Sequence, residues 1–258
     1  MNFLSRPSSA RWMRFIQEAY YSRAKLKAAL RTGVSIEVRN HVDWCLYNDI
    51  FVDGEYDRAI SDLLRANKST LRVLDLGCNV GFFVLRILDR LLLDNNPKTL
   101  EIAAVEPDDI NVAEFRRRLS QQTNFRDGDL RCEIAQGLAG KKRGSEVFFH
   151  THSHHAGSVI AALSADKRRG QSVDYIDVST RFGSESWDLI KCDIEGAEKH
   201  FVDSYPEVLA KTGIFVVELH HGICELEDLA QSLNNAALRY RGCLAHRAAN
   251  SVHMFSRD

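Results

Sequence analysis

A group of acidic residues follows a hydrophobic strand in the second half of the sequence. In the stretch WDLIKCDIEGAEKHF, residues 187–201, Asp193, Glu195 and Glu198 lie around one glycine within six positions. Carboxylates at the end of a buried strand cost desolvation free energy unless a polar group or a cation meets them there. We expect Asp193 and Glu195 to act in acid–base chemistry or in orienting a substrate. Glu198 is interpreted as a helix-surface charge, and Lys191 as a structural partner of a neighbouring carboxylate.

Histidines end the next predicted strand, GIFVVELH, at residues 213–220. His220 is a candidate base because the pKa of an imidazole lies near neutrality. His221 is either a further member of the site or a solvated side chain. The carboxyl ends of neighbouring parallel strands meet at one edge of a sheet. We therefore predict that Asp193, Glu195 and His220 form the catalytic set.

A glycine-containing turn, VLDLGCNVGFF, joins an earlier strand to its helix. Glycines there let the backbone turn sharply and let a ligand lie close to it. The dinucleotide fingerprint is G-x-G-x-x-G, whereas the spacing here is D-x-G-x-x-x-G. The carboxylate of Asp75, the first residue of this motif, suits a cationic group such as the amino end of S-adenosylmethionine (SAM). The predicted cofactor-binding residues of this turn are Asp75, Gly77, Cys78, Asn79 and Gly81.

The following strands supply further candidates for cofactor binding. Glu106 ends the strand EIAAVEP, beside Pro107, where a carboxylate can accept hydrogen bonds from ribose hydroxyls. Gln136 and Gly137 end the strand RCEIAQG, where they are placed to contact an adenine base. Asp193 borders the same edge and is included in the cofactor set. The cofactor predicted from this arrangement is SAM.

A histidine-rich segment, FFHTHSHHAGSVI, follows the strand near residues 145–150. His152, His154 and His155 are weak candidates for ligands of a divalent metal ion, with Asp193 or His220 as a further ligand. A polar lid over the acceptor is the alternative interpretation. A metal ion is therefore possible but not the favoured prediction.

The elements that must position these residues alternate along the chain. Helical spacing near 9–31 and 41–51 predicts an N-terminal helical extension over residues 1–58, followed by a main domain over 59–258. Near-continuous apolar strands alternating with helices predict an α/β, Rossmann-like domain with a parallel sheet covered on both faces. The expected strands are 71–77, 101–107, 131–137, 145–150, 187–193, 213–220 and a closing pair in the tail, and the expected helices are 57–66, 80–93, 108–121 and 224–238.

These motifs resemble the FkbM family of SAM-dependent methyltransferases, over roughly residues 45–220. The resemblance implies a class I methyltransferase fold, with a seven-stranded sheet whose last strand is antiparallel. It also implies transfer of a methyl group from SAM, typically to a hydroxyl of a sugar, polyketide or other small molecule. The residues that match the family pattern are Asp75, Gly77, Asn79, Gly81, Glu106, Pro107, Lys191, Asp193, Glu195, Gly196 and Glu198.

The composition of the chain narrows the range of partners and cellular locations that we expect. The chain of 258 residues has 34 basic and 35 acidic residues, so no nucleic-acid partner is expected. Its six cysteines form no C-x-x-C pair, which favours reduced thiols and a cytoplasmic protein. No apolar run reaches the length of a transmembrane segment, and the N-terminus lacks the apolar core of a signal peptide, although it has some features of a transit peptide.

Other functions stay open at this point. A metal-assisted O-methyltransferase using the histidine-rich loop is one, and a catalytically inactive SAM-binding or scaffold module is another. A nucleic-acid base methyltransferase is disfavoured because the strand ends in DIEG. The acceptor and the oligomeric state are not predicted.

Overall fold

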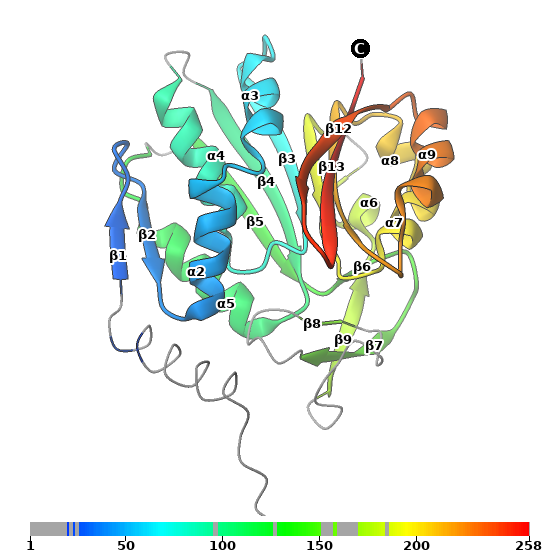
Figure 1. Ribbon diagram of the computed structural model, residues 1–258, viewed down its shortest axis with the longest axis horizontal. Coiled ribbons are helices and arrows are strands. Elements are labelled where there is room, and N and C mark those ends of the chain that lie inside the picture. Colours follow the sequence, from blue (N-terminus) through cyan, green and yellow to red (C-terminus); the bar gives the residue numbers. More distant parts are fainter. Residues whose placement is uncertain are drawn as a thin grey trace, which may run out of the picture.

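A seven-stranded sheet forms the centre of the molecule (Figure 1). The computed structural model describes residues 20, 23, 26–94, 98–125, 128–150, 157–158, 170–183 and 186–257. Within these residues the strand order is β12-β13-β11-β10-β3-β4-β5. The strands are β3 (Thr70–Leu76), β4 (Thr99–Glu106), β5 (Leu130–Gln136), β10 (Leu189–Cys192), β11 (Ile214–His220), β12 (Arg239–His246) and β13 (Asn250–Ser256).

The direction of the strands confirms the predicted fold class. β13 runs antiparallel to both of its neighbours, β11 and β12. The pairs β3–β4, β4–β5, β3–β10 and β10–β11 are all parallel. This is the mostly parallel seven-stranded sheet with an antiparallel last strand that a class I methyltransferase fold requires.

The chain changes direction across the sheet at β3. From β3 the chain adds β4 and β5 on one side, and then it returns to place β10 and β11 on the other. In open α/β sheets a ligand binds at the carboxyl ends of the strands beside such a switch point. The ends of β3, β4, β10 and β11 are therefore where a site is expected.

Helices cover both faces of the sheet, as Figure 1 shows. One hydrophobic cluster contains side chains of α3, α4 and α5, and a second cluster contains side chains of α7, α8 and α9. Along β3, Val73 belongs to the first cluster and Leu74 to the second, because successive side chains of a strand point to opposite faces. The helices are α3 (Asp57–Arg65), α4 (Phe82–Leu93), α5 (Asp109–Ser120), α6 (Val178–Phe182), α7 (Glu198–Ser204), α8 (Pro206–Leu209) and α9 (Leu226–Asn235).

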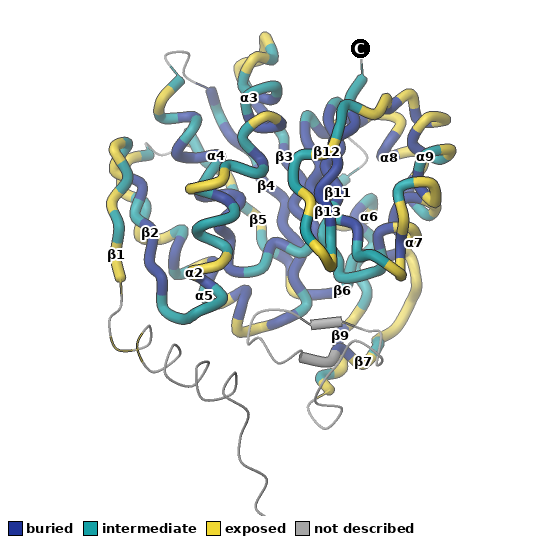
Figure 2. Tube along the Cα trace, viewed as in Figure 1, coloured by how far each residue is buried: buried dark blue, intermediate teal, exposed yellow. Residues whose placement is uncertain are grey.

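Burial follows this layering, with the central strands buried and the outer helix surfaces exposed (Figure 2). The predicted helices near 57–66, 80–93, 108–121 and 224–238 are confirmed. Asp108 caps α5 by accepting hydrogen bonds from the backbone N–H groups of Ile110 and Asn111. Among the described helices, none combines the length and apolar character that crossing a bilayer requires.

The N-terminal segment differs from the predicted helical extension. β1 (Leu26–Ala29) and β2 (Ser35–Val38) form an antiparallel hairpin, so the helix predicted over 9–31 is wrong for residues 26–29. The hairpin forms because the β-branched residues of β2 are buried and pair with β1 across a turn with Gly33 at φ 87°. The next predicted helix is confirmed as α2 (His41–Tyr47), which continues into a π-helical turn, η1 (Asn48–Val52).

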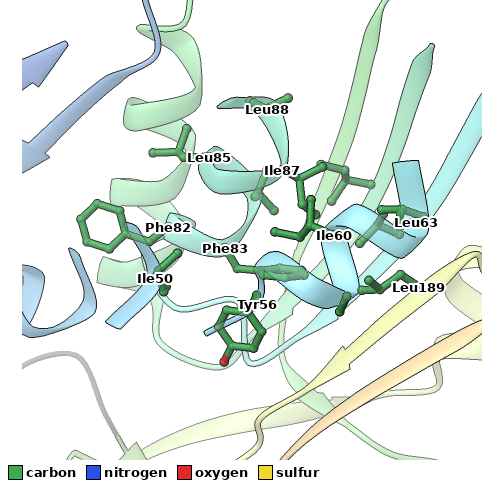
Figure 3. Packing of buried hydrophobic residues seen from close by; sticks show 14 of the residues in the cluster. Ile50, Tyr56, Ile60, Leu63, Phe82, Phe83, Leu85, Ile87, Leu88 and Leu189 are labelled. Carbon is green, nitrogen blue, oxygen red and sulfur yellow. The ribbon is translucent and has the colours of Figure 1, made fainter. Parts of the chain in front are cut away.

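This segment shares its core with the sheet. Ile50 and Tyr56 belong to the same buried cluster as residues of α3 and α4 (Figure 3). Arg118 of α5, with only 2% of its side chain exposed, makes an ion pair of 2.8 Å with the fully buried Asp43. A domain boundary at residue 58 stays a prediction, but residues 34–56 pack as part of the central domain.

A second, smaller sheet lies between β5 and β10 in the sequence. Its described strands have the order β6-β9-β7-β8. They are β6 (Leu138–Ala139), β7 (Ser145–His150), β8 (Gly157–Ser158) and β9 (Gly170–Ile176), and β7 confirms the strand predicted at 145–150. His152, His154 and His155 lie outside the described residues, so their predicted metal binding stays a prediction.

Candidate functional site

The glycine loop after β3 is pressed against the turn that follows β10. Gly77 has φ 72°, and a Cβ atom there would lie 1.7 Å from the carbonyl oxygen of Asp193. Gly81 has φ 86°, and a Cβ atom there would lie 2.1 Å from the ring of Phe115. Both positions need glycine because the conformation is left-handed and the space is already occupied. The two glycines therefore bring the ends of β3 and β10 together and let the loop pack against α5.

Asn79 and Cys78 complete this loop. Asn79 also has a positive φ, 49°, and its side-chain oxygen accepts a hydrogen bond of 2.7 Å from the N–H of Val80. Asparagine tolerates this conformation better than most residues because its side chain bonds locally. Cys78 is buried, and burial raises the pKa of its thiol well above the usual value. Cys78 is therefore a packed neutral side chain in this loop.

Glu106 ties the glycine loop to the end of β4. One of its oxygens accepts the N–H of Asn79 at 2.9 Å. The other accepts the N–H of Asp108 at 3.2 Å and the side-chain amide of Asn111 at 3.1 Å. A carboxylate offers about four acceptor positions, so these three donors leave room for one more hydrogen bond. Burial raises the pKa of Glu106 to about 7, although the three hydrogen bonds act against this rise.

The residues predicted to contact adenine lie beside Glu106. The N–H of Gly137 donates to the carbonyl oxygen of Glu106 at 3.0 Å. The side-chain amide of Gln136, an exposed residue, donates to the carbonyl oxygen of Pro107 at 3.5 Å. A Cβ atom on Gly137 would lie 2.5 Å from Ile176, so this glycine also packs β5 against β9.

Asp75 has a partner inside the protein. Its side chain is fully buried, and the Lys191 ammonium lies 3.4 Å from its Oδ1 atom. The same ammonium lies 3.4 Å from Asp193 and donates a 3.0 Å hydrogen bond to the carbonyl oxygen of Gly77. Burial raises the pKa of Asp75, whereas Lys191 acts to lower it. Burial acts to lower the pKa of Lys191, but Asp75 and Asp193 raise it above the usual value.

This arrangement changes the expected role of Asp75. The predicted pairing of Lys191 with a neighbouring carboxylate is confirmed, since Asp75 and Lys191 face each other on adjacent strands. The cation that Asp75 contacts is therefore Lys191. A ligand's amino group would have to approach a carboxylate that is already paired and shielded from solvent.

The structure brings together the three residues of the predicted catalytic set. One ligand-type atom from each of Asp193, Glu195 and His220 lies within 4.8 Å of the others. Asp193 directly follows β10, and His220 is the last residue of β11. Glu195 has φ 55°, which a non-glycine residue adopts only when its surroundings hold it there. Gly196 continues the turn at φ 98°.

His220 lies between two carboxylates. Its Nε2 atom is 3.2 Å from Glu195, and its Nδ1 atom is 3.3 Å from Glu198. Burial acts to lower the pKa of His220, but its bonds to Glu195 and Glu198 raise it to about 11. His220 is therefore an imidazolium at neutral pH. The sequence led us to expect a base with a pKa near neutrality, and the pKa of His220 is higher than that.

Glu198 is not the surface charge that the sequence suggested. Its side chain is fully buried. As the first residue of α7 it reaches back into the preceding turn, where it accepts the N–H groups of Ile194 at 3.2 Å and Gly196 at 3.0 Å. It therefore holds the DIEG turn in place, with an oxygen 3.3 Å from Nδ1 of His220.

Residues distant in sequence complete the edge of the site. Burial, followed by the charge of Asp193, raises the pKa of Glu218 to about 8. The side-chain amide of Asn250, at the start of β13, donates to Glu218. Arg247 makes a hydrogen bond of 2.6 Å with Glu55, in the turn before α3. Sequence reasoning missed Glu55, Arg247 and Asn250, because no local pattern places these residues beside the ends of β10 and β11.

His221 lies just outside this group. Its Nε2 atom is 2.9 Å from the hydroxyl of Ser251, on the neighbouring strand β13. Its ring centroid is 5.4 Å from that of His246, at the end of β12. His221 therefore has partners along the edge of the last three strands.

Comparisons with known proteins find likeness in structure only. No family model matches the sequence, and no curated protein matches it. A crystal structure of magnesium protoporphyrin IX methyltransferase from Synechocystis PCC 6803 with bound SAM is 10% identical, with a TM-score of 0.46, and the alignment covers 95% of this chain and 97% of that one. The METTL16 MTase domain is 12% identical, with a TM-score of 0.48 and coverages of 98% and 97%.

A third similar structure is the N-terminal domain of EvdMO1 with SAH bound. It is 12% identical, with a TM-score of 0.48, and the alignment covers 98% of this chain and 100% of that one. At such low identity the acceptor of one protein says nothing about that of another. The strand order and strand directions of the chain itself carry the fold assignment.

Proposed function

We propose that this chain is a SAM-dependent methyltransferase, that it belongs to the FkbM family it resembles, and that it methylates a hydroxyl of a small molecule or glycan. The observation that carries the proposal is the junction between Asn79 and Glu106. It joins the glycine loop after β3 to a carboxylate at the end of β4, beside the switch point of a class I methyltransferase sheet. A ligand with a hydroxyl that donates to Glu106 and with an extended chain suits this junction.

Each part of the junction has a role in holding SAM. The acceptor position left on Glu106 binds a ribose hydroxyl, and the glycine loop leaves its backbone close to the amino-acid end of SAM. Gln136 and Gly137 lie at the carboxyl end of the next strand, where they border the base. Lys191 pairs with the buried Asp75 and holds the loop through the carbonyl oxygen of Gly77.

The acceptor side is formed by the ends of β10 and β11. Bound SAM supplies an electrophilic methyl carbon, which the acceptor oxygen attacks in line as the carbon–sulfur bond breaks and sulfur keeps the electron pair. Asp193 is the side chain proposed to take the hydroxyl proton, since His220 already carries both of its ring protons. Glu195 and His220 orient the acceptor through hydrogen bonds, and positioning of this kind lowers the barrier.

The charges around this edge favour an uncharged acceptor. Asp193 lies beside Glu195 and interacts electrostatically with Glu218 and Glu55, and Lys191 is shared between Asp193, Asp75 and Gly77. Carboxylates repel phosphate groups, so a polyol, sugar or polyketide hydroxyl fits better than a nucleic acid.

Titration calorimetry with SAM tests the cofactor. Above about pH 7, where Glu106 is ionised, Glu106→Gln removes an ionised acceptor. Hydrogen bonds to charged groups contribute about 1.5–3 kcal/mol, so SAM affinity should fall by about 10- to 150-fold. Glu101→Gln is the matched control, because Glu101 lies on the same strand but pairs with Arg72 and Arg131 away from the junction. Absence of SAM binding, or equal binding in both variants, would overturn the proposal.

A transfer assay tests the acceptor. Tritiated-methyl SAM is offered with sugars, polyketides and short nucleic acids, and methylation of hydroxyl acceptors is expected. Transfer to nucleic acid alone would contradict the proposed acceptor class. SAM binding with no transfer to any acceptor would support an inactive SAM-binding module instead.

A further inference from the structure

Asp193, Glu195 and His220 have the composition and spacing of a metal site. Their ligand-type atoms lie within 4.8 Å of one another, and all three side chains are only partly buried. They come from the ends of two adjacent strands and from the turn between β10 and α7, so the rigid sheet holds them. Two carboxylates and one imidazole are a ligand set that leaves further positions on an ion open to water or substrate.

A buried carboxylate behind His220 supplies an independent observation. Metal-binding histidines usually donate their second ring N–H to a carboxylate, which fixes the ring and leaves the other nitrogen for the metal. An oxygen of Glu198 lies behind the ring, 3.3 Å from Nδ1, while Nε2 faces Glu195. The Glu198 side chain is fully buried, and neither its Oε2 atom nor His220 Nδ1 has a hydrogen-bond partner among the described residues. Glu198 therefore lies where it can accept the Nδ1–H of a metal-bound His220.

The negative charge of the cluster also favours the binding of a cation. Asp193, Glu195 and Glu198 surround His220, and the nearby Lys191 is shared between Asp193, Asp75 and the carbonyl oxygen of Gly77. A divalent ion held by Asp193 and Glu195 would neutralise their negative charge.

We propose that Asp193, Glu195 and His220 bind a divalent first-row transition-metal ion, such as Mn²⁺, Fe²⁺ or Zn²⁺, with Glu198 orienting His220. Imidazole with carboxylates suits these ions, whereas Mg²⁺ and Ca²⁺ prefer ligand sets made of oxygen alone. The site lies at the ends of β10 and β11. It therefore does not require the histidine-rich segment.

The role of the ion rests on the proposed function, although binding of the ion does not. An ion here would hold the acceptor hydroxyl and lower its pKa. Asp193 is then a ligand of the ion, so the hydroxyl proton passes to solvent in place of Asp193. The oxygen–carbon bond forms, and the carbon–sulfur bond of SAM breaks with its electron pair on sulfur.

Electron paramagnetic resonance of Mn²⁺ with the chelator-treated full chain tests the site. We expect one saturable Mn²⁺ site, which Zn²⁺ displaces and Mg²⁺ displaces poorly. Glu195→Gln and His220→Gln should each weaken binding at least tenfold, and Glu198→Gln should weaken it about 10- to 100-fold. Glu207→Gln is the control, because Glu207 pairs with Lys141 at the surface.

The outcomes separate this site from its alternatives. Glu195 is the most exposed of the three ligands, at 36%. Glu195→Gln therefore tests the site even where a variant of the more buried His220 does not fold, and thermal melts identify such variants. Absence of saturable Mn²⁺ binding, or full binding in Glu195→Gln, would overturn the proposal. So would loss of binding in the triple variant of His152, His154 and His155 to Ala.

SAM titration of the same preparation distinguishes the two proposals. SAM binding without Mn²⁺ binding overturns the ion site and leaves the proposed function standing. Mn²⁺ binding without SAM binding overturns the proposed function and supports the ion site.

Discussion

The ion pair between Lys191 and Asp75 gives the sharpest test of the structure. Lys191 exposes 6% of its side chain and Asp75 exposes none, so neither charge is compensated by solvent. Lys191→Met removes the cation and leaves a buried carboxylate unpaired. Breaking a buried pair in this way costs about 3–5 kcal/mol of the free energy of unfolding. We expect a loss of this size at pH 7, measured by urea unfolding.

A second substitution shows that the loss comes from charge. Asp75→Asn in the Lys191→Met background removes the unpaired carboxylate, so the double variant should regain at least half of the lost free energy. Lys199→Met is the control. Lys199 pairs with Asp203 at the surface, where 51% and 45% of the two side chains are exposed, and loss of such a pair costs about 0.2–1 kcal/mol.

The pH dependence of the Lys191→Met variant follows from the same pair. Burial already raises the pKa of Asp75 with Lys191 present, and loss of Lys191 raises it further. The folded variant then binds a proton more tightly than the unfolded chain does. The difference in free energy of unfolding between the wild type and Lys191→Met should therefore become smaller as the pH falls below the pKa of folded Asp75. A deficit under about 1 kcal/mol, or a double variant no more stable than the single one, would refute this account.

Urea unfolding, calorimetry and NMR test three further predictions. Gly77→Ala should destabilise by more than about 2 kcal/mol, because its φ is 72° and a Cβ atom would meet a backbone oxygen, whereas Gly144→Ala, with φ 95° and open space, should cost about 1 kcal/mol in urea unfolding. SAM affinity should rise as the pH rises through about 7, where Glu106 ionises, and calorimetry should find no such rise in Glu106→Gln. By NMR, His220 should not titrate between about pH 6 and 8, and Glu198→Gln should lower its pKa. Because the pKa of folded His220 is raised to about 11, its contribution to stability is complete below about 6.5 and is lost as the pH rises through about 11.

The fold was largely predictable because its signals are local. The apolar runs of β3, β4, β10 and β11 and the glycine turn after β3 indicated a parallel sheet buried on both faces, and the structure confirms it. The hairpin of β1 and β2 was not predictable in the same way. Its strands are stabilised by pairing with each other and by packing of β2 on α2 and α5, which the spacing within residues 9–31 does not record.

Some features of the candidate site were likewise predictable from local sequence, and others were not. The sequence by itself determined that Asp193, Glu195 and His220 stand at strand ends, and parallel strands bring such ends to one edge. Only the tertiary structure decided that Lys191 of β10 faces Asp75 on the adjacent strand β3, and that the Glu198 side chain is buried beside His220. The reason is physical. Position at a strand end follows from local periodicity, whereas burial and charge pairing depend on which distant residues the folded chain places within a few ångströms.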